Sequence, residues 1–131
     1  MKTVITFGTF DLFHIGHLNI LERASRHGDR LVVGVSSDEL NLRKKNFRPL
    51  FPLRDRMRIV EALSFVQEVF VEESLELKPD YVRRYGAGVL VMGHDWSGKF
   101  DFLRDLCDVV YLPRTQDIST SLLKERIKHP I

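Results

Sequence analysis

The sequence of 131 residues contains a single cysteine and no long hydrophobic run. Cys107 cannot form an internal disulfide, and a chain of this length can bury a core that needs no covalent staple. The longest apolar stretch, of the kind seen at 31–35, is far shorter than the roughly 18 residues of a membrane span. The opening residues lead into a strand-like pattern without a signal-peptide cleavage pattern. We therefore expect a protein of the reducing cytoplasm.

An excess of charge of one sign is also missing. The 20 basic and 18 acidic side chains leave a net charge of +2, which is too balanced to predict nucleic acid or an anionic membrane as a partner. The distribution is uneven, because seven basic side chains and one acid, Asp55, lie between residues 43 and 58. Most charge runs are solvated surface. In a near-neutral protein, however, a local cationic segment favours a small polyanionic ligand.

Three widespread phosphate and hydrolase loops are absent. There is no Gly-x-x-x-x-Gly-Lys-Ser/Thr loop, no Gly-x-Gly-x-x-Gly after the first strand and no Gly-x-Ser-x-Gly elbow. P-loop hydrolysis, the usual dehydrogenase chemistry and serine hydrolysis therefore lack their signatures. No cluster of cysteine and histidine supplies the three or four ligands of a zinc site, so we expect no protein-held metal.

Short apolar segments alternate with amphipathic ones along the whole chain. Apolar runs predict strands, and helical spacing predicts helices; a short helical turn is expected at 37–42, followed by a loop around Pro49 and Pro52. Apolar strands separated by helices indicate a parallel sheet covered on both faces, and right-handed crossovers make it doubly wound. We expect an α/β fold, a single Rossmann-like domain over 1–131 with a five-stranded parallel sheet. The predicted strands are 3–7, 30–35, 69–71, 89–92 and 109–112, and the predicted helices are 17–26, 53–65, 79–85, 100–106 and 119–128.

Ligands of such sheets bind beyond the carboxyl ends of the strands, and the segment after the first strand contains two histidines. His14 and His17 flank Gly16 at the entry to a helix, which places both imidazoles near the first turn. A helix N-terminus suits phosphate, and Gly8 and Gly16 allow a ligand to approach the backbone. The two histidines are candidate donors to a phosphoryl group. The alternative interpretation is that they only cap the helix.

Polar side chains also follow the fourth and fifth predicted strands. After the fourth come Gly93, His94, Asp95 and Trp96, a tight turn that an ordinary loop with a surface aromatic would also explain. After the fifth, Arg114 precedes several hydroxyls at a helix start, which suits a triphosphate. Capping by Ser119 or Asp117 would account for the hydroxyls without accounting for Arg114. In the cationic run, Arg56 shares a helix with apolar residues and is expected to point partly inward.

Taken together, these segments resemble the glycerol-3-phosphate cytidylyltransferase family of the His-x-Gly-His nucleotidyltransferase superfamily. The resemblance covers essentially the whole chain. It rests on four stretches of this sequence: Val4-Ile5-Thr6-Phe7-Gly8-Thr9-Phe10-Asp11, Leu21-Glu22-Arg23-Ala24, Met92-Gly93-x-Asp95-Trp96-x-Gly98-Lys99-Phe100, and Val109-Val110-Tyr111-Leu112-Pro113-Arg114-Thr115.

The resemblance implies in-line attack of an alcohol phosphate on the α-phosphorus of CTP, with magnesium carried by the triphosphate, in a homodimer. It implies catalytic roles for His14, His17, Arg114 and Lys44. The nucleotide would be bound by Gly8, Thr9, Phe10, Gly16, Gly93, Asp95, Arg114, Thr115, Ile118, Ser119, Thr120 and Ser121. The acceptor would be bound by Lys44, Arg56, Lys78, His94, Asp95 and Trp96.

The sequence departs from the family pattern at several positions. Gln116-Asp117 stands where the family has Glu-Gly, His94 where it usually has Asp, Asn46 where it has a second lysine, and Ser64 where it has a helix arginine. Cytidylyl transfer to glycerol-3-phosphate is the leading hypothesis. The alternatives are phosphoethanolamine or phosphocholine as acceptor, ATP as donor, and a non-catalytic nucleotide-binding module.

Overall fold

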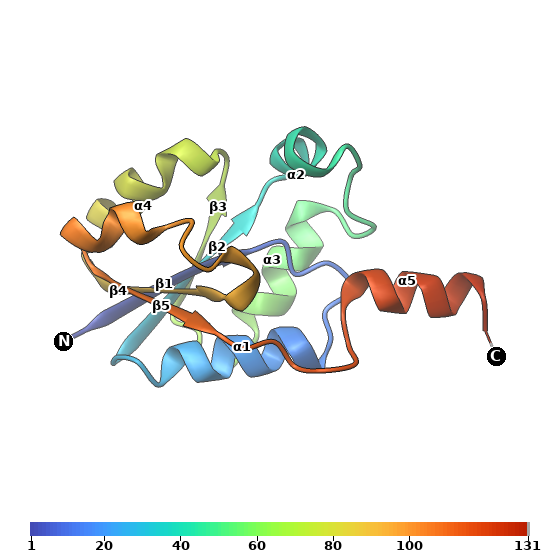
Figure 1. Ribbon diagram of the computed structural model, residues 1–131, viewed down its shortest axis with the longest axis horizontal. Coiled ribbons are helices and arrows are strands. Elements are labelled where there is room, and N and C mark those ends of the chain that lie inside the picture. The colour runs from blue at the N-terminus through green and yellow to red at the C-terminus, as the bar shows by residue number, and fades with distance from the viewer. Residues whose placement is uncertain (131) are drawn as a thin grey trace.

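Five parallel strands form one sheet with helices on both faces in the computed structural model, which describes residues 1–130 (Figure 1). The strand order is β3-β2-β1-β4-β5, so the winding direction reverses between β1 and β4. The predicted α/β doubly wound fold is confirmed. The strands are β1 (Thr3–Gly8), β2 (Arg30–Ser36), β3 (Glu68–Glu72), β4 (Ala87–Gly93) and β5 (Asp108–Leu112). The helices are α1 (Ile15–Ser25), α2 (Asp38–Lys45), α3 (Leu53–Glu61), α4 (Lys78–Arg84) and α5 (Thr120–Lys128), with short 3₁₀ helices η1 (Leu75–Leu77), η2 (His94–Trp96) and η3 (Asp101–Asp105).

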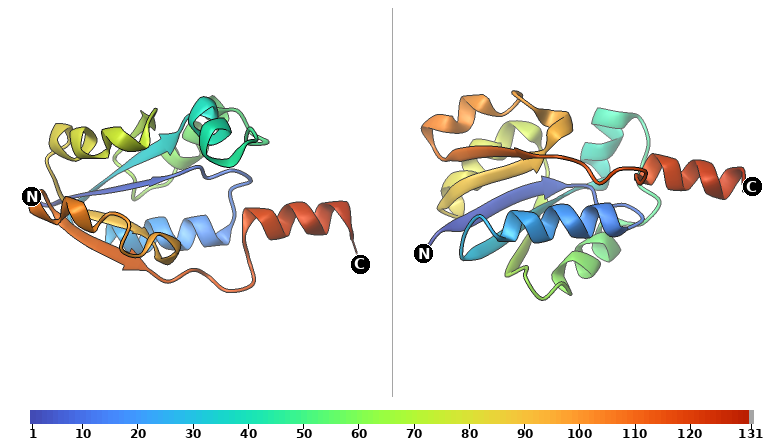
Figure 2. Two further views of the ribbon diagram at one scale, coloured as in Figure 1. Left: turned by 45° about the horizontal axis from the view of Figure 1, so that its top comes forward. Right: turned by 60° about the horizontal axis from the view of Figure 1, so that its bottom comes forward.

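The sheet separates two hydrophobic layers because successive strand residues point to opposite faces. In β4, Val89 and Val91 pack with α1 and α3, whereas Leu90 and Met92 pack with α4 and η3. Both faces are buried, which explains why the strands read as continuous apolar runs. The last helix, α5, differs from α1 to α4 because it has no buried residue. It extends away from the rest of the protein at the carboxyl edge of the sheet (Figure 2). None of the helices within residues 1–130 is long and apolar enough to cross a membrane.

Helix α2 is longer than predicted. Its last turn contains Arg43–Lys45, which the sequence pattern assigned to a loop. The side chain of Ser37 caps the helix by accepting a hydrogen bond from the amide of Leu40 at 3.0 Å. Acidic residues in the first turn and basic residues in the last complement the helix dipole. The cap and this charge pattern favour a helix that continues three residues past the predicted turn.

Two predicted helices near the sheet are shorter than expected. Helix α3 ends at Glu61 rather than at 65, because i→i+3 turns at Leu63 and Val66 bring the chain to the Gln67 amide, which donates to Leu31 of β2. The predicted helix 100–106 is the 3₁₀ helix η3. Cys107 follows it as a buried free thiol just before β5, not within a helix.

Candidate active site

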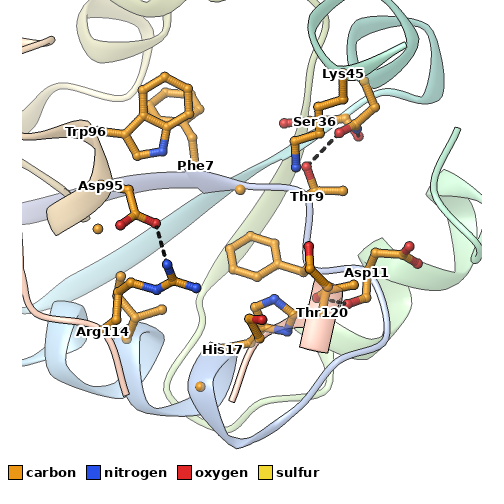
Figure 3. A pocket seen from close by; sticks show the side chains of 18 of the residues that line it. Phe7, Thr9, Asp11, His17, Ser36, Lys45, Asp95, Trp96, Arg114 and Thr120 are labelled. Atoms are coloured by element: carbon orange, nitrogen blue, oxygen red, sulfur yellow. Dashed lines mark hydrogen bonds and ion pairs between the residues drawn. The ribbon is translucent and has the colours of Figure 1, made fainter. Parts of the chain in front are cut away.

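The carboxyl ends of the strands surround a cavity of about 640 Å³, which lies at the reversal of the winding. This volume is in the usual range for a small-molecule site. All predicted site residues line it except Arg56 and His94. Figure 3 shows side chains from β1, the start of α1, η2 and the segment before α5 directed toward this space. The lining residues among those predicted are Gly8, Thr9, Phe10, His14, Gly16, His17, Lys44, Lys78, Gly93, Asp95, Trp96, Arg114, Thr115, Ile118, Ser119, Thr120 and Ser121.

His14 is the N-cap of α1, so the helix begins two residues earlier than predicted. Its Nδ1 accepts a hydrogen bond from the amide of Gly16 at 3.0 Å, and Nδ1 of His17 accepts one from the amide of His14 at 3.2 Å. The two rings stack with centroids 3.8 Å apart. A side chain at position 16 would clash, because a Cβ there would lie 2.8 Å from the His14 ring. The glycine of the motif is therefore required by the capping geometry.

These contacts fix the tautomer of both histidines. Because each Nδ1 is an acceptor, the proton of each neutral ring is on Nε2. Nε2 of His14 is buried and has no hydrogen-bond partner within residues 1–130. Burial lowers the pKa of His17 to about 3, helped by its neighbour His14, and burial followed by Arg114 lowers the pKa of His14. Both rings are therefore neutral at physiological pH, and the capping contacts through Nδ1 leave the Nε2–H of each ring available.

The loop between β1 and α1 is strained where it borders the cavity. Phe10 and Leu12 have φ values of 56° and 49°, in the left-handed region that non-glycine residues rarely adopt. The Phe10 ring folds back over Gly8, where an added Cβ would lie 2.7 Å from the ring. Strain of this kind is common at functional sites.

Arg114 and Asp95 bring together the segments after β5 and β4. Arg114 Nη1 lies 3.3 Å from Asp95 Oδ2, and both side chains are more than half exposed (Figure 3). The pair is therefore screened by solvent and can open for a ligand. Next to Arg114, the hydroxyl of Thr115 accepts a hydrogen bond from Asn19 Nδ2 at 2.9 Å, which ties α1 to the segment before α5.

Arg56 lies outside the cavity lining, beneath the strand ends. Its side chain is fully buried, and it donates to the carbonyls of Thr9, Ser36 and Phe51 at 2.8–2.9 Å and to Asp38 at 2.6 Å. With these donors already used, we assign it a supporting role rather than the expected contact with the acceptor. The inward orientation predicted for Arg56 is confirmed.

His94 also lies outside the lining. It begins η2, and its Nδ1 is 3.2 Å from Ser97 Oγ. The expectation that His94 contacts the acceptor is not supported by this placement, because the turn that directs Asp95 and Trp96 inward leaves position 94 outside the cavity.

Several cavity residues had not been identified from sequence. Asp11 accepts hydrogen bonds from the amides of Leu50 and Phe51 at 2.8 and 2.9 Å, so this buried carboxylate holds the cationic segment against the site. The others include Ser36, Asn41, Lys45, Glu72 and Lys124. Ser36 and Glu72 end apolar strands, which is a signal that could have identified them, since all parallel strands end at the same edge.

No group of three or more His, Cys, Asp or Glu side chains in residues 1–130 could hold a metal ion. The carboxylates that line the cavity are already engaged. Asp11 accepts from two backbone amides, Glu72 pairs with Lys78, and Asp95 pairs with Arg114. The site as a whole offers neutral N–H donors and cations, which suits a polyphosphate.

An α/β sheet of this topology with paired histidines at the first helix N-terminus and a cationic site at the strand ends defines a nucleotidyltransferase. The family model described as cytidylyltransferase-like matches residues 5–126. The chain belongs to the glycerol-3-phosphate cytidylyltransferase family.

Two relatives match over nearly their whole length. The glycerol-3-phosphate cytidylyltransferase of Bacillus subtilis (strain 168) is 50% identical over 127 residues, covering 97% of this chain and 98% of the relative. That of Staphylococcus aureus (strain NCTC 8325 / PS 47) is 43% identical over 127 residues, covering 97% and 96%. Among solved structures, the lipopolysaccharide core biosynthesis protein from Thermoplasma volcanium GSS1 aligns with a TM-score of 0.78 at 21% identity, over 88% of this chain and 99% of that chain. The last similarity concerns the fold alone.

Proposed function

We propose that this chain transfers CMP from CTP to glycerol-3-phosphate, giving CDP-glycerol and pyrophosphate. A phosphate oxygen of the acceptor forms a bond to the α-phosphorus, and the bond from that phosphorus to the pyrophosphate bridging oxygen breaks, with its electron pair leaving on pyrophosphate. The nucleophile is already ionised, so the reaction depends on positioning and charge neutralisation more than on a general base.

The observation that carries this proposal is the pair of neutral histidines at the cavity, in a chain of this family. The buried, unpartnered Nε2–H of His14 is available to an oxygen at the α-phosphorus. We assign His17 the same role because its tautomer is fixed in the same way. Arg114 would release Asp95 and bind the triphosphate. Loss of one such donor costs roughly 100-fold or more in turnover.

The remaining lining residues are assigned by the segment they belong to. Gly8, Thr9 and Phe10 border the nucleotide on the β1 side. Thr115, Ile118, Ser119, Thr120 and Ser121 would hold cytidine and triphosphate at the start of α5. We propose that magnesium enters with the triphosphate as part of the substrate, because no group of three or more His, Cys, Asp or Glu side chains within residues 1–130 could hold the ion on its own.

Charge favours glycerol-3-phosphate over the cationic acceptors. The cavity lining includes Lys44 and Lys45 in the last turn of α2, which would repel the ammonium group of phosphocholine or phosphoethanolamine.

The test is pyrophosphate release with magnesium, pairing CTP or ATP with glycerol-3-phosphate, phosphoethanolamine or phosphocholine. Release with CTP and glycerol-3-phosphate only is expected. Release with another pair would reassign the substrates, and CTP binding without any release would indicate a non-catalytic module.

A homodimer and a cytoplasmic location belong to the same proposal. Five strands leave sheet edges that a partner would cover, and light scattering would give about twice the 15.3 kDa of the chain. A mass near that of the monomer would refute the dimer. The buried thiol of Cys107 is free, a state that a reducing compartment preserves.

A further inference from the structure

A chain of buried polar contacts runs along the wall of the cavity formed by β2 and β3. Ser36 and Glu72 are the last residues of these strands and are paired in register. The Ser36 hydroxyl donates to Glu72 Oε1 at 3.1 Å, and Lys44 Nζ donates to Ser36 Oγ at 3.3 Å. The other Glu72 oxygen accepts from Lys78 Nζ. Ser36, Glu72 and Lys78 are at most 1% exposed, so this network is built into the protein.

Lys78 is the buried end of this network. Its ammonium lies 4.3 Å from the centroid of the Phe7 ring and 5.0 Å from that of Phe100, in addition to its ion pair with Glu72. A carboxylate buried without a partner would be strongly destabilising, and the ammonium of Lys78 is the partner that neutralises Glu72. Lys44 is the other end of the network, and its half-buried side chain lines the cavity.

The charge of Glu72 favours the protonated form of Lys44, whereas the charges of three neighbouring cations disfavour it. These cations are Lys45 on α2, Lys78 on α4 and Arg56 on α3. Burial lowers the pKa of Lys44 to about 8, Glu72 opposes this shift, and the three cations add to it. Removing the Glu72 charge would leave Lys44 partly unprotonated near neutral pH.

We propose that Glu72 is a positioning residue for the transfer: held by Lys78, its buried carboxylate fixes the Lys44 ammonium through the Ser36 hydroxyl, where Lys44 binds the acceptor phosphate. This inference rests on the proposed function. Glu72 itself does not contact the reacting atoms. It sets the position and the charge of Lys44, the cation that binds the acceptor.

The kinetic test compares Glu72→Gln with Glu68→Gln. Glu68 is on the same strand and pairs with Arg30 at 2.7 Å, but it lies outside the cavity. Glu72→Gln is expected to raise KM for glycerol-3-phosphate about tenfold while KM for CTP changes less than about twofold. The alkaline fall of kcat/KM should move to lower pH, because Lys44 loses its proton earlier. Glu68→Gln should change none of these values.

Ser36→Ala keeps the test decisive if Glu72→Gln does not fold. This substitution breaks the link to Lys44 and leaves the ion pair of Glu72 and Lys78 intact, so the same selective rise in KM for glycerol-3-phosphate is expected. An equal rise of both KM values, or none, would overturn the proposal.

A substrate-free measurement separates this inference from the proposed function. Lysines labelled with ¹³C-methyl groups are titrated by NMR, and the Lys44 signal is assigned by its loss in Lys44→Arg. The Lys44 pKa should be about 8 in the unmodified sequence, lower in Glu72→Gln and unchanged in Glu68→Gln. An identical pKa in Glu72→Gln would refute the role of Glu72. Absence of turnover with CTP and glycerol-3-phosphate would instead refute the proposed function.

Discussion

Replacing Arg56 by methionine should remove the support beneath the strand ends while keeping the length of the side chain. The guanidinium donates to the carbonyls of Thr9, Ser36 and Phe51 and forms an ion pair with Asp38, and its side chain is 0% exposed. Each carbonyl left without this donor costs about 1 kcal/mol, at the low end for a buried group. The side chain of Asp38 is 26% exposed and can be rehydrated, so the loss of its ion pair with Arg56 adds only about 1 kcal/mol.

The expected loss of unfolding free energy is therefore about 4 kcal/mol, which agrees with the roughly 3–5 kcal/mol typical of breaking a buried charge pair. A domain of ordinary stability, about 5–15 kcal/mol, would survive this loss with reduced stability. Urea denaturation with linear extrapolation measures it. Arg56→Lys should recover less than half of the unfolding free energy lost in Arg56→Met, because one ammonium cannot reach four acceptors on separate segments.

Arg58→Met is the matched control. Arg58 lies on the same helix with an exposed side chain, and its replacement should change the unfolding free energy by less than about 0.5 kcal/mol. A loss below about 1 kcal/mol in Arg56→Met, or a loss equal to that of Arg58→Met, would refute the reasoning.

Three further predictions concern pH and backbone geometry. The pKa of His17 falls from 6.5 to about 3 on folding, so only the unfolded chain binds its proton between these values. Urea midpoints should therefore drop from pH 7 to pH 5 more steeply in the unmodified sequence than in His17→Gln, and parallel drops would contradict the assignment. Asp117 has φ 62°, so calorimetry should show Asp117→Val losing about 1–2 kcal/mol and Asp117→Gly losing little. Equal losses would show that the loop relaxes. Gly34→Ala should cost about 1–3 kcal/mol in urea unfolding, since its Cβ would lie 2.6 Å from Phe7 and 2.8 Å from Phe70. A neutral effect would mean that the rings can shift.

Segments with a strong local pattern could be predicted from the sequence. The five strands and the order of elements follow from apolar runs and helical spacing, because these periods reflect which face each residue buries. The His-x-Gly-His spacing likewise predicted histidines at the start of a helix. Arg114 was predicted to join the segment after β4 at one site, and the structure places it beside Asp95.

Errors arose where local signals compete. Helix α2 formed across a polar segment because its cap and charge pattern favour it despite the absence of an apolar face. His94 and Asp95 are neighbours in sequence, and only the turn of η2 decides that Asp95 faces the cavity while His94 does not.

The sequence by itself determined the individual strands and the histidine pair, since each depends on residues close together in the chain, and it determined the family through motifs spread along the whole chain. The tertiary structure alone decided the contacts of Asp11 with residues 39 and 40 positions away, and the link from Glu72 to Ser36 across 36 positions. Spacing along the chain carries no information about such pairs, because they form only when distant segments meet at the carboxyl edge of the sheet. Burial at that edge also lowers the pKa of Lys44 to about 8 and that of His17 to about 3, which spacing along the chain does not reveal.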